Sequence, residues 1–254
     1  MPYAMAMAGK GGTGKTTVAG FLIKYLVQNG KTPVLAVDAD SNTNLNEVLG
    51  VPLKATLGTA REEMKKGVVQ KGMTKQIFME MRLAEAIVEG QGFDLIAMGR
   101  PEGPGCYCAA NSLLSMYLEK LIANYPYMVM DNEAGMEHIS RLTTNNVDVL
   151  LVVSDPSIRG IEAAGRITHL VDELNVNVVR RFLIINQVRD GVPDSLQEAI
   201  VKHGLNLAGI IPKDDVLYDF DMNGDPTAHL PDDNPAVCAA FDIFDRIIGV
   251  NTPT

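Results

Sequence analysis

The chain contains few of the residues that define several common classes of protein. Three of its 254 residues are cysteine, which is too few for a disulfide framework. It has 22 lysines and arginines against 31 aspartates and glutamates, a net charge of −9. That balance argues against a surface for nucleic acid, because phosphate backbones are bound by clusters of Lys and Arg. The four histidines are scattered and form no His-rich tract.

Long hydrophobic runs are also missing. No stretch of 18 apolar residues occurs, so we expect no membrane span. The apolar stretch at residues 3–8 is short and has no basic segment before it, so it does not resemble a secretory signal. We therefore expect a cytoplasmic protein. No repeat or linker is evident, and we expect one domain over residues 1–254.

The most informative segment is the glycine-rich stretch at residues 9–17, Gly-Lys-Gly-Gly-Thr-Gly-Lys-Thr-Thr, which fits the phosphate-binding pattern GxxxxGK[ST]. It lies between an apolar stretch and an apolar-periodic run, as a strand–loop–helix unit requires. Backbone N–H groups and the helix N-terminus then bind phosphate. Lys15 reaches the β- and γ-phosphates, and the Thr16 hydroxyl binds Mg²⁺. We predict an ATP/ADP and Mg²⁺ site formed by Gly11, Gly12, Thr13, Gly14, Lys15, Thr16 and Thr17.

Beyond this segment, apolar and amphipathic stretches alternate, which predicts an α/β fold. We expect a doubly wound, mostly parallel sheet flanked by helices on both faces. The expected strands are residues 3–8, 33–38, 93–98, 127–131, 147–153, 178–186 and 207–211. The expected helices are residues 15–29, 75–89, 111–124, 137–145, 158–174, 195–203 and 235–248, with Gly90 ending the second. Residues 54–76, Lys-rich and interrupted by glycine, are expected to form a mobile or variable insertion.

Two carboxylates follow the second predicted strand, at the sheet edge where ligands bind in such folds. Asp38 is expected to bind Mg²⁺ through water. Asp40 is expected to orient the water that attacks the γ-phosphate, since phosphoryl transfer depends mostly on positioning. The alternative is that Asp40 caps the following helix, as Ser41 or Asn42 equally can.

The fourth predicted strand ends in a similar way, at Asp131, which has the position of a Walker B acid near Mg²⁺. Gly135 is expected to offer its backbone N–H to the γ-phosphate and to move when that group leaves. Glu137 and His138 together suggest a metal site, but we favour the simpler interpretation that both belong to the first turn of a helix.

Two later strand ends are candidates for binding the base. The amide of Asn186 is suited to the adenine edge, and the loop that contains Pro212 can present backbone groups to the same base. The alternative is ordinary turn chemistry after a strand.

A cysteine pair, Cys106 and Cys108, lies in a loop rich in glycine and proline. Both sulfurs can meet one ion, but a closed tetrahedral site needs four ligands. A homodimer in which each chain donates its pair is the simplest solution. Thiolates suit Zn²⁺, Ni²⁺ or Cu⁺. The alternatives are two buried small residues or a redox pair. Cys238, alone in an apolar helix, is expected in the core.

Taken together, these motifs carry a resemblance to a known class. The string 10–16, Lys-Gly-Gly-Thr-Gly-Lys-Thr, resembles the deviant Walker A motif of the MinD/ParA/nitrogenase-iron-protein ATPases. This resemblance implies that Lys10 crosses a dimer interface to the partner's phosphates. It also implies that Asp38 and Asp40 belong to switch I and Asp131 to Walker B.

Three further strings narrow the resemblance: Gly-Pro-Gly-Cys-Tyr-Cys, Asp-x-x-Ala-Gly-Met-Glu-His and Ile-Ile-Pro. They are similar to the CooC/AcsF group of nickel-inserting ATPases. The implied activity is ATP hydrolysis by a homodimer that delivers Ni²⁺ to a client nickel enzyme, either acetyl-CoA synthase or carbon monoxide dehydrogenase. Glu133 departs from the Gly or Pro that many members of the wider class have there, and implies either an extra metal or water contact or a solvent-facing residue.

Two other functions compete with nickel insertion. A positioning ATPase of the ParA or MinD type needs a basic DNA-binding surface or a basic amphipathic membrane helix, and the C-terminus has few basic residues. The second is an electron donor or cluster carrier, a dimeric ATPase bridged by an iron–sulfur cluster. Such a cluster would also use four cysteines, but the tight Cys-x-Cys spacing disfavours it.

Overall fold

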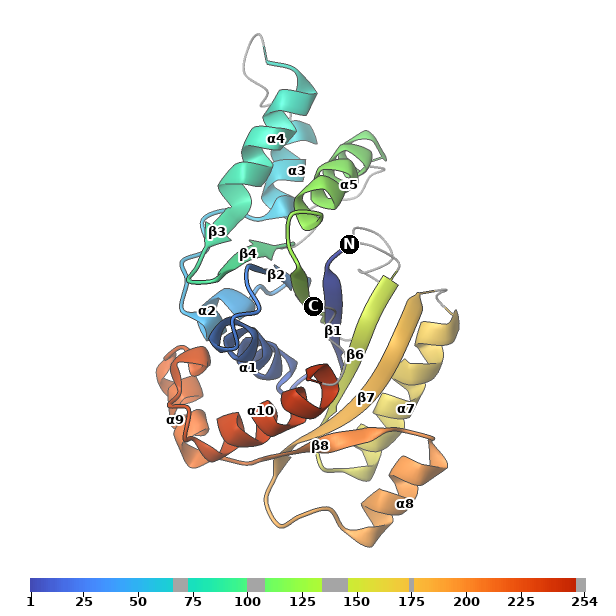
Figure 1. Cartoon of the computed structure of the whole chain (residues 1–254). Coiled ribbons are helices and arrows are strands. Elements are labelled where there is room, and N and C mark those ends of the chain that lie inside the picture. Colours follow the sequence, from blue (N-terminus) through green and yellow to red (C-terminus); the bar gives the residue numbers. More distant parts are fainter. Residues whose placement is uncertain (66–72, 100–107, 134–145, 174–175, 250–254) are drawn as a thin grey trace.

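The computed structural model describes residues 1–65, 73–99, 108–133, 146–173 and 176–249 (Figure 1). In these residues the strands form one sheet in the order β3-β4-β2-β5-β1-β6-β7-β8, and every neighbouring pair is parallel except β3 with β4. The strands are β1 (Tyr3–Ala8), β2 (Val34–Asp38), β3 (Ile87–Glu89), β4 (Phe93–Ala97), β5 (Tyr127–Asp131), β6 (Asn146–Ser154), β7 (Asn177–Val188) and β8 (Leu207–Pro212). The expected mostly parallel α/β sheet is confirmed.

Helices cover both faces of the sheet, and the period of two along β1 divides its residues between them. Met5 and Met7 belong to the core on the face covered by one set of helices, α1 (Lys15–Gln28), α2 (Leu45–Leu49) and α10 (Pro235–Ile248). Ala4, Ala6 and Ala8 belong to the core on the opposite face. That second face is covered by α3 (Leu57–Lys65), α4 (Lys75–Ala86), α5 (Cys108–Ile122), α7 (Ile158–Glu173) and α8 (Asp194–Lys202).

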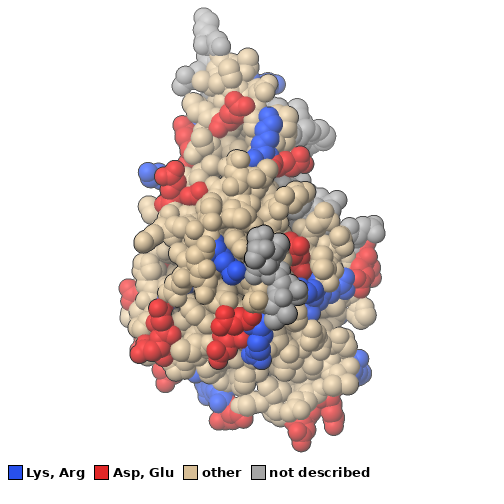
Figure 2. All heavy atoms as spheres, in the orientation of Figure 1, with Lys and Arg blue, Asp and Glu red and all other residues tan. Residues whose placement is uncertain are grey.

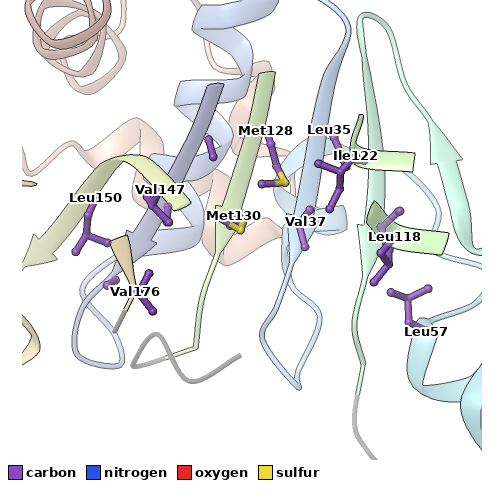
Figure 3. Packing of buried hydrophobic residues seen from close by; sticks show 14 of the residues in the cluster. Leu35, Val37, Leu57, Leu118, Ile122, Met128, Met130, Val147, Leu150 and Val176 are labelled. Atoms are coloured by element: carbon purple, nitrogen blue, oxygen red, sulfur yellow. The ribbon is translucent and has the colours of Figure 1, made fainter. Parts of the chain in front are cut away.

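Figure 3 shows this second core from close by. Leu35 and Val37 of β2 and Met128 and Met130 of β5 point to the same side of the sheet. All four side chains are buried. Because one face of each strand is fixed in this way, the register of β2 against β5 is fixed as well.

The predicted helix over residues 75–89 is wrong at its end. Helix α4 stops at Ala86, and Ile87–Glu89 forms the antiparallel edge strand β3 beside β4. The β-branched pair Ile87 and Val88 favours a strand. Gly92, with φ of 82°, turns the chain back, and the Gly90 N–H donates to the Phe93 carbonyl. Gly90 therefore belongs to a hairpin turn and does not end the helix.

Within residues 54–76, which are expected to be a mobile or variable insertion, residues 57–65 form the helix α3 and pack on the core. Three apolar residues of this largely polar helix, Leu57, Ala60 and Met64, are buried in the core. Their spacing of three and four places them on one helix face. The predicted helix 137–145 lies outside the described residues.

Helix α10 has the predicted bounds, but Cys238 was placed wrongly. The buried face of α10 includes Val237, Ala240 and Phe244, and the helical period turns Cys238 away from it. Its side chain is exposed, and Sγ donates to the Asp232 carbonyl at 3.1 Å.

Three further short elements were not predicted: helix α2, α9 (Asp215–Asn223) and the 3₁₀ turn η1 (Thr227–His229). None of the helices within the described ranges is both long and apolar enough to cross a membrane. On the face in Figure 2, Lys and Arg side chains are interspersed with Asp and Glu and form no broad basic field among the residues described there.

Candidate functional site

The glycine loop occupies the turn between β1 and α1, as predicted. Gly14 immediately precedes α1 with φ of 84°, a left-handed conformation. A Cβ atom at Gly14 would collide with the Asn186 amide nitrogen, and the left-handed φ also disfavours any side chain here. The loop is closed by the Thr13 hydroxyl, which donates to the Lys10 carbonyl at 2.9 Å. The helix N-terminus and the loop amides therefore face one anion-binding position.

Lys15 is the cation of this loop. Its side chain is buried, and Nζ donates to the Lys10 carbonyl at 3.2 Å. Burial lowers the pKa of Lys15, while the negative charges of Asp131, Asp40 and Glu133 oppose that shift. Lys10, in contrast, has an exposed side chain. Its expected reach across a dimer interface stays a prediction.

The register of the sheet brings Asp38 and Asp131 together. They are Cα partners at the ends of the neighbouring strands β2 and β5, and both are buried. Burial raises the pKa of Asp131 to about 7, against a hydrogen bond with Thr16 that lowers it. Burial likewise raises the pKa of Asp38 to about 6. Two adjacent carboxylates with raised pKa values mark a place where negative charge lacks compensation from the protein itself.

The two carboxylates are used differently. Asp38 accepts the backbone N–H groups of Asp40 and Leu45, each at 3.0 Å, so it holds the loop between β2 and α2. Asp131 Oδ1 is buried and has no hydrogen-bond partner among the described residues. The orphaned oxygen, the neighbouring Thr16 hydroxyl and the uncompensated charge together fit a magnesium ion.

Asp40 lies in the loop after β2 and lines the same pocket. Its carboxylate accepts the Asn42 N–H at 2.8 Å. Asp38, rather than Asp40, binds the first amide of α2, at Leu45. The capping alternative for Asp40 therefore applies to a local turn and not to the helix.

The pocket itself measures about 630 Å³ and extends from the glycine loop to α9 and η1. Its phosphate end includes Lys15, Thr16 and Asp40. The complete lining consists of Gly11, Gly12, Gly14, Lys15, Thr16, Thr17, Asp40, Asn42, Asn44, Glu47, Val48, Glu133, Asn186, Gln187, Leu217, Asp221, Gly224, Asp225 and Thr227.

The nucleoside end differs in part from the prediction. Asn186 lines the pocket, but its amide nitrogen donates to the Thr13 carbonyl at 2.9 Å and so ties β7 to the glycine loop. Pro212 ends β8 and is not part of the pocket wall. That wall includes Leu217 and Asp221 of α9, two residues that were not predicted to belong to the site. The apolar residues that follow the Ile-Ile-Pro loop were the one sequence feature that could have indicated this helix.

The predicted metal-binding cysteines are only partly covered. Cys106 lies outside the described residues, as do Gly135, Glu137 and His138. Cys108 is the first residue of α5. In the part of the chain that the structure describes, no group of three or more His, Cys, Asp or Glu side chains is arranged to hold a metal ion.

A glycine loop between a parallel strand and a helix, with carboxylates at two adjacent strand ends, defines a P-loop nucleotide-binding protein. Residues 4–227 match the CobQ/CobB/MinD/ParA nucleotide binding domain. The chain therefore belongs to this family and is an ATP-binding protein of the MinD/ParA type.

Two curated relatives and one solved structure illustrate the similarity. An uncharacterized ATP-binding protein of Methanocaldococcus jannaschii is 40% identical over 96% of this chain and 98% of that protein. The carbon monoxide dehydrogenase accessory protein CooC of Rhodospirillum rubrum is 33% identical over 69% of this chain and 71% of its own length. The septum site-determining protein MinD of Pyrococcus horikoshii, solved with Mg-ADP, has a TM-score of 0.69 at 20% identity, covering 98% of this chain and 96% of that one.

Proposed function

We propose that this chain hydrolyses ATP to ADP and phosphate at the phosphate end of the pocket. The observation that carries this proposal is the state of Asp131. Its carboxylate is buried with one oxygen unpartnered, and it lies close enough to Lys15 and Thr16 for its pKa to respond to both. A buried carboxylate oxygen without a hydrogen-bond partner is unfavourable unless a cation binds it. Magnesium nucleotide supplies that cation together with the phosphates that the glycine loop binds.

Each residue of the site has a distinct role in this proposal. Lys15 binds the β- and γ-phosphates, and the loop amides orient them. Thr16 and Asp131 would hold Mg²⁺, which when bound neutralises charge on the phosphate oxygens. Asp40 orients the attacking water, and its carboxylate can do so while Oδ1 accepts the Asn42 N–H, because a carboxylate has several acceptor positions. Asp38 keeps the loop that carries Asp40 in place through two backbone N–H groups.

The test compares three variants by calorimetric ATP binding and by phosphate release. Lys15→Ala should lose ATP binding. Asp40→Asn should keep binding within about threefold but lose about 100-fold in hydrolysis, the usual size of a lost acid–base group. Glu198→Gln, on the exposed surface of α8, is the matched control and should behave as the wild type. Normal turnover in Lys15→Ala or Asp40→Asn would contradict the proposal.

We further propose that ATP hydrolysis controls nickel handling for acetyl-CoA synthase or carbon monoxide dehydrogenase in the cytoplasm. Support comes from the sequence Cys106-Tyr-Cys108 and from the similarity to the CooC accessory protein. In this proposal two chains form a homodimer on binding ATP, each Lys10 crosses to its partner, and four thiolates bind one Ni²⁺. Zn²⁺ fits the same thiolates, so the metal is a property to measure.

The chain offers its own control for this second proposal, because its third cysteine is exposed on α10. We expect the double variant Cys106→Ala/Cys108→Ala to lose Ni²⁺ binding, and Cys238→Ala to retain it. The expected stoichiometry is one Ni²⁺ per two chains, with the mass of a dimer in the presence of ATP. Undiminished Ni²⁺ affinity in the double variant, or one Ni²⁺ per monomer, would exclude the proposed site. Titrations with ADP and with Zn²⁺ identify the nucleotide state and the metal.

A further inference from the structure

The loops after β2 and β5 meet at the phosphate end of the pocket through a pair of side chains. The Ser41 hydroxyl donates to Glu133 Oε2 at 3.3 Å, although the two residues are 92 positions apart in the sequence. Glu133 lines the pocket. Its side chain is otherwise exposed, so a hydrogen bond from Ser41 restricts where this long carboxylate points.

Glu133 lies in a pocket whose described lining has more acidic than basic side chains. Among the described residues of the lining, Lys15 is the single lysine or arginine. Five carboxylates line the same pocket: Asp40, Glu47, Glu133, Asp221 and Asp225. A triphosphate is itself highly anionic, so free ATP meets net repulsion here, whereas Mg²⁺-bound ATP meets less.

Of these five carboxylates, Glu133 and Asp40 are the ones whose charge acts on Lys15. Asp40 has a partner in its own turn, the Asn42 amide. Glu133 has no such backbone amide in the structure described here, and its contact is the Ser41 hydroxyl. Glu133 therefore adds negative charge beside Lys15, where the terminal phosphates bind, although the charge of Asp40 acts on Lys15 more strongly.

We propose that Glu133 is a positioning residue that makes the site select Mg²⁺-bound over metal-free nucleotide, and that Ser41 holds its carboxylate at the pocket. This inference rests on the proposed ATP site and specifies its substrate as the magnesium complex. The Glu133 charge disfavours metal-free ATP, and the cation that accompanies Mg²⁺·ATP offsets it. The residue acts through the charge of the site and takes no part in bond making.

The measured quantity is the ratio of two dissociation constants, that of ATP in EDTA divided by that of ATP in excess MgCl₂. This ratio expresses the coupling between metal and nucleotide. A variant that merely distorts the pocket raises both dissociation constants by a similar factor, so their ratio stays unchanged. Calorimetric titration at constant ionic strength gives both constants without any need for turnover, so the readout is independent of hydrolysis.

We expect Glu133→Gln, which keeps an acceptor for Ser41 but removes the charge, to lower the ratio about five- to tenfold. Ser41→Ala should lower it by a smaller factor, because the carboxylate is then free to turn to solvent. Glu198→Gln removes an equal charge far from the site and should leave the ratio unchanged. In 0.5 M KCl the effect of Glu133→Gln should shrink, because salt screens exposed charges.

An unchanged or increased ratio in Glu133→Gln would overturn the proposal, and an unchanged ratio in Ser41→Ala would overturn the role of Ser41. Both of these outcomes differ from a failure of the proposed ATP site. If the ATP site itself is wrong, the wild type binds no ATP, or Lys15→Ala binds ATP as tightly as the wild type does.

Discussion

The substitution Asp131→Asn should make the nucleotide-free protein more stable at alkaline pH. Asp131 is buried, and its pKa is raised from 3.8 to about 7. A raised carboxyl pKa means that the folded chain holds a proton that the unfolded chain has released. The contribution of protonated Asp131 to the free energy of unfolding is therefore fully present below about pH 4 and is lost as the pH rises through about 7. A neutral asparagine has the same shape and loses nothing over this range.

The magnitude follows from that pKa difference. At about 1.4 kcal/mol for each pH unit, ionising Asp131 at pH 8 lowers the free energy of unfolding by on the order of 4 kcal/mol. For a chain of 254 residues, one kcal/mol corresponds to about 2 °C in Tm. We therefore expect Asp131→Asn to melt about 8 °C above the wild type at pH 8 and close to it at pH 4.5.

The assay is differential scanning calorimetry at both pH values, in EDTA and without nucleotide. Asp233→Asn, at an exposed position, controls for loss of one negative charge. Addition of Mg²⁺ and ADP at pH 8 should stabilise the wild type but not Asp131→Asn, because the variant lacks the carboxylate that the ion requires. A Tm difference that is equal at the two pH values, or a variant less stable at pH 8, would refute the reasoning.

Three further predictions concern the loop and the core. Gly14→Ala should weaken ATP binding at least tenfold by calorimetry, because its Cβ collides with the Asn186 amide at a left-handed φ; wild-type affinity would contradict this. Tyr25→Phe should lower the free energy of unfolding by about 2 kcal/mol in urea titrations, since Tyr25 donates to Asp245 at 2.5 Å; an unchanged midpoint would show that this hydrogen bond contributes nothing. Phe244→Ala empties a fully buried position of α10 and should cost about 4 kcal/mol by the same titration with ATP binding retained; a loss under 1 kcal/mol would contradict the packing.

The sequence predicts the centre of the fold better than its periphery, for a physical reason. Strands buried on both faces, such as β5 and β6, consist mainly of apolar residues, and their short length and β-branched or aromatic content favour a strand. Helix α9 was missed because four of its nine residues, Asp-Val-Leu-Tyr-Asp-Phe-Asp-Met-Asn, carry acidic or amide side chains and none of its residues is buried. Its two apolar contacts, Leu217 and Phe220, are partly buried against the core.

The candidate site also has parts that the sequence predicts and parts that it does not. The glycine loop, Asp38, Asp40 and Asp131 were identified because each follows a predictable strand. The contact of Ser41 with Glu133 was not, since it joins residues from two different loops and depends on strand order. The far wall of the pocket was missed together with α9. What sequence alone cannot give is which side chains from separate segments face one cavity.

The alignment of Asp38 beside Asp131 constrains how this protein can change over evolutionary time. Inserting or deleting a single residue within β2 or β5 would turn one of the two carboxylates to the opposite side of the sheet and empty half of the acidic pair. Related chains should therefore vary in length elsewhere, as in the segment between α3 and α4, while keeping the distance from the first residue of each strand to its terminal aspartate constant. A homologue that breaks this spacing should have abandoned magnesium nucleotide as its ligand.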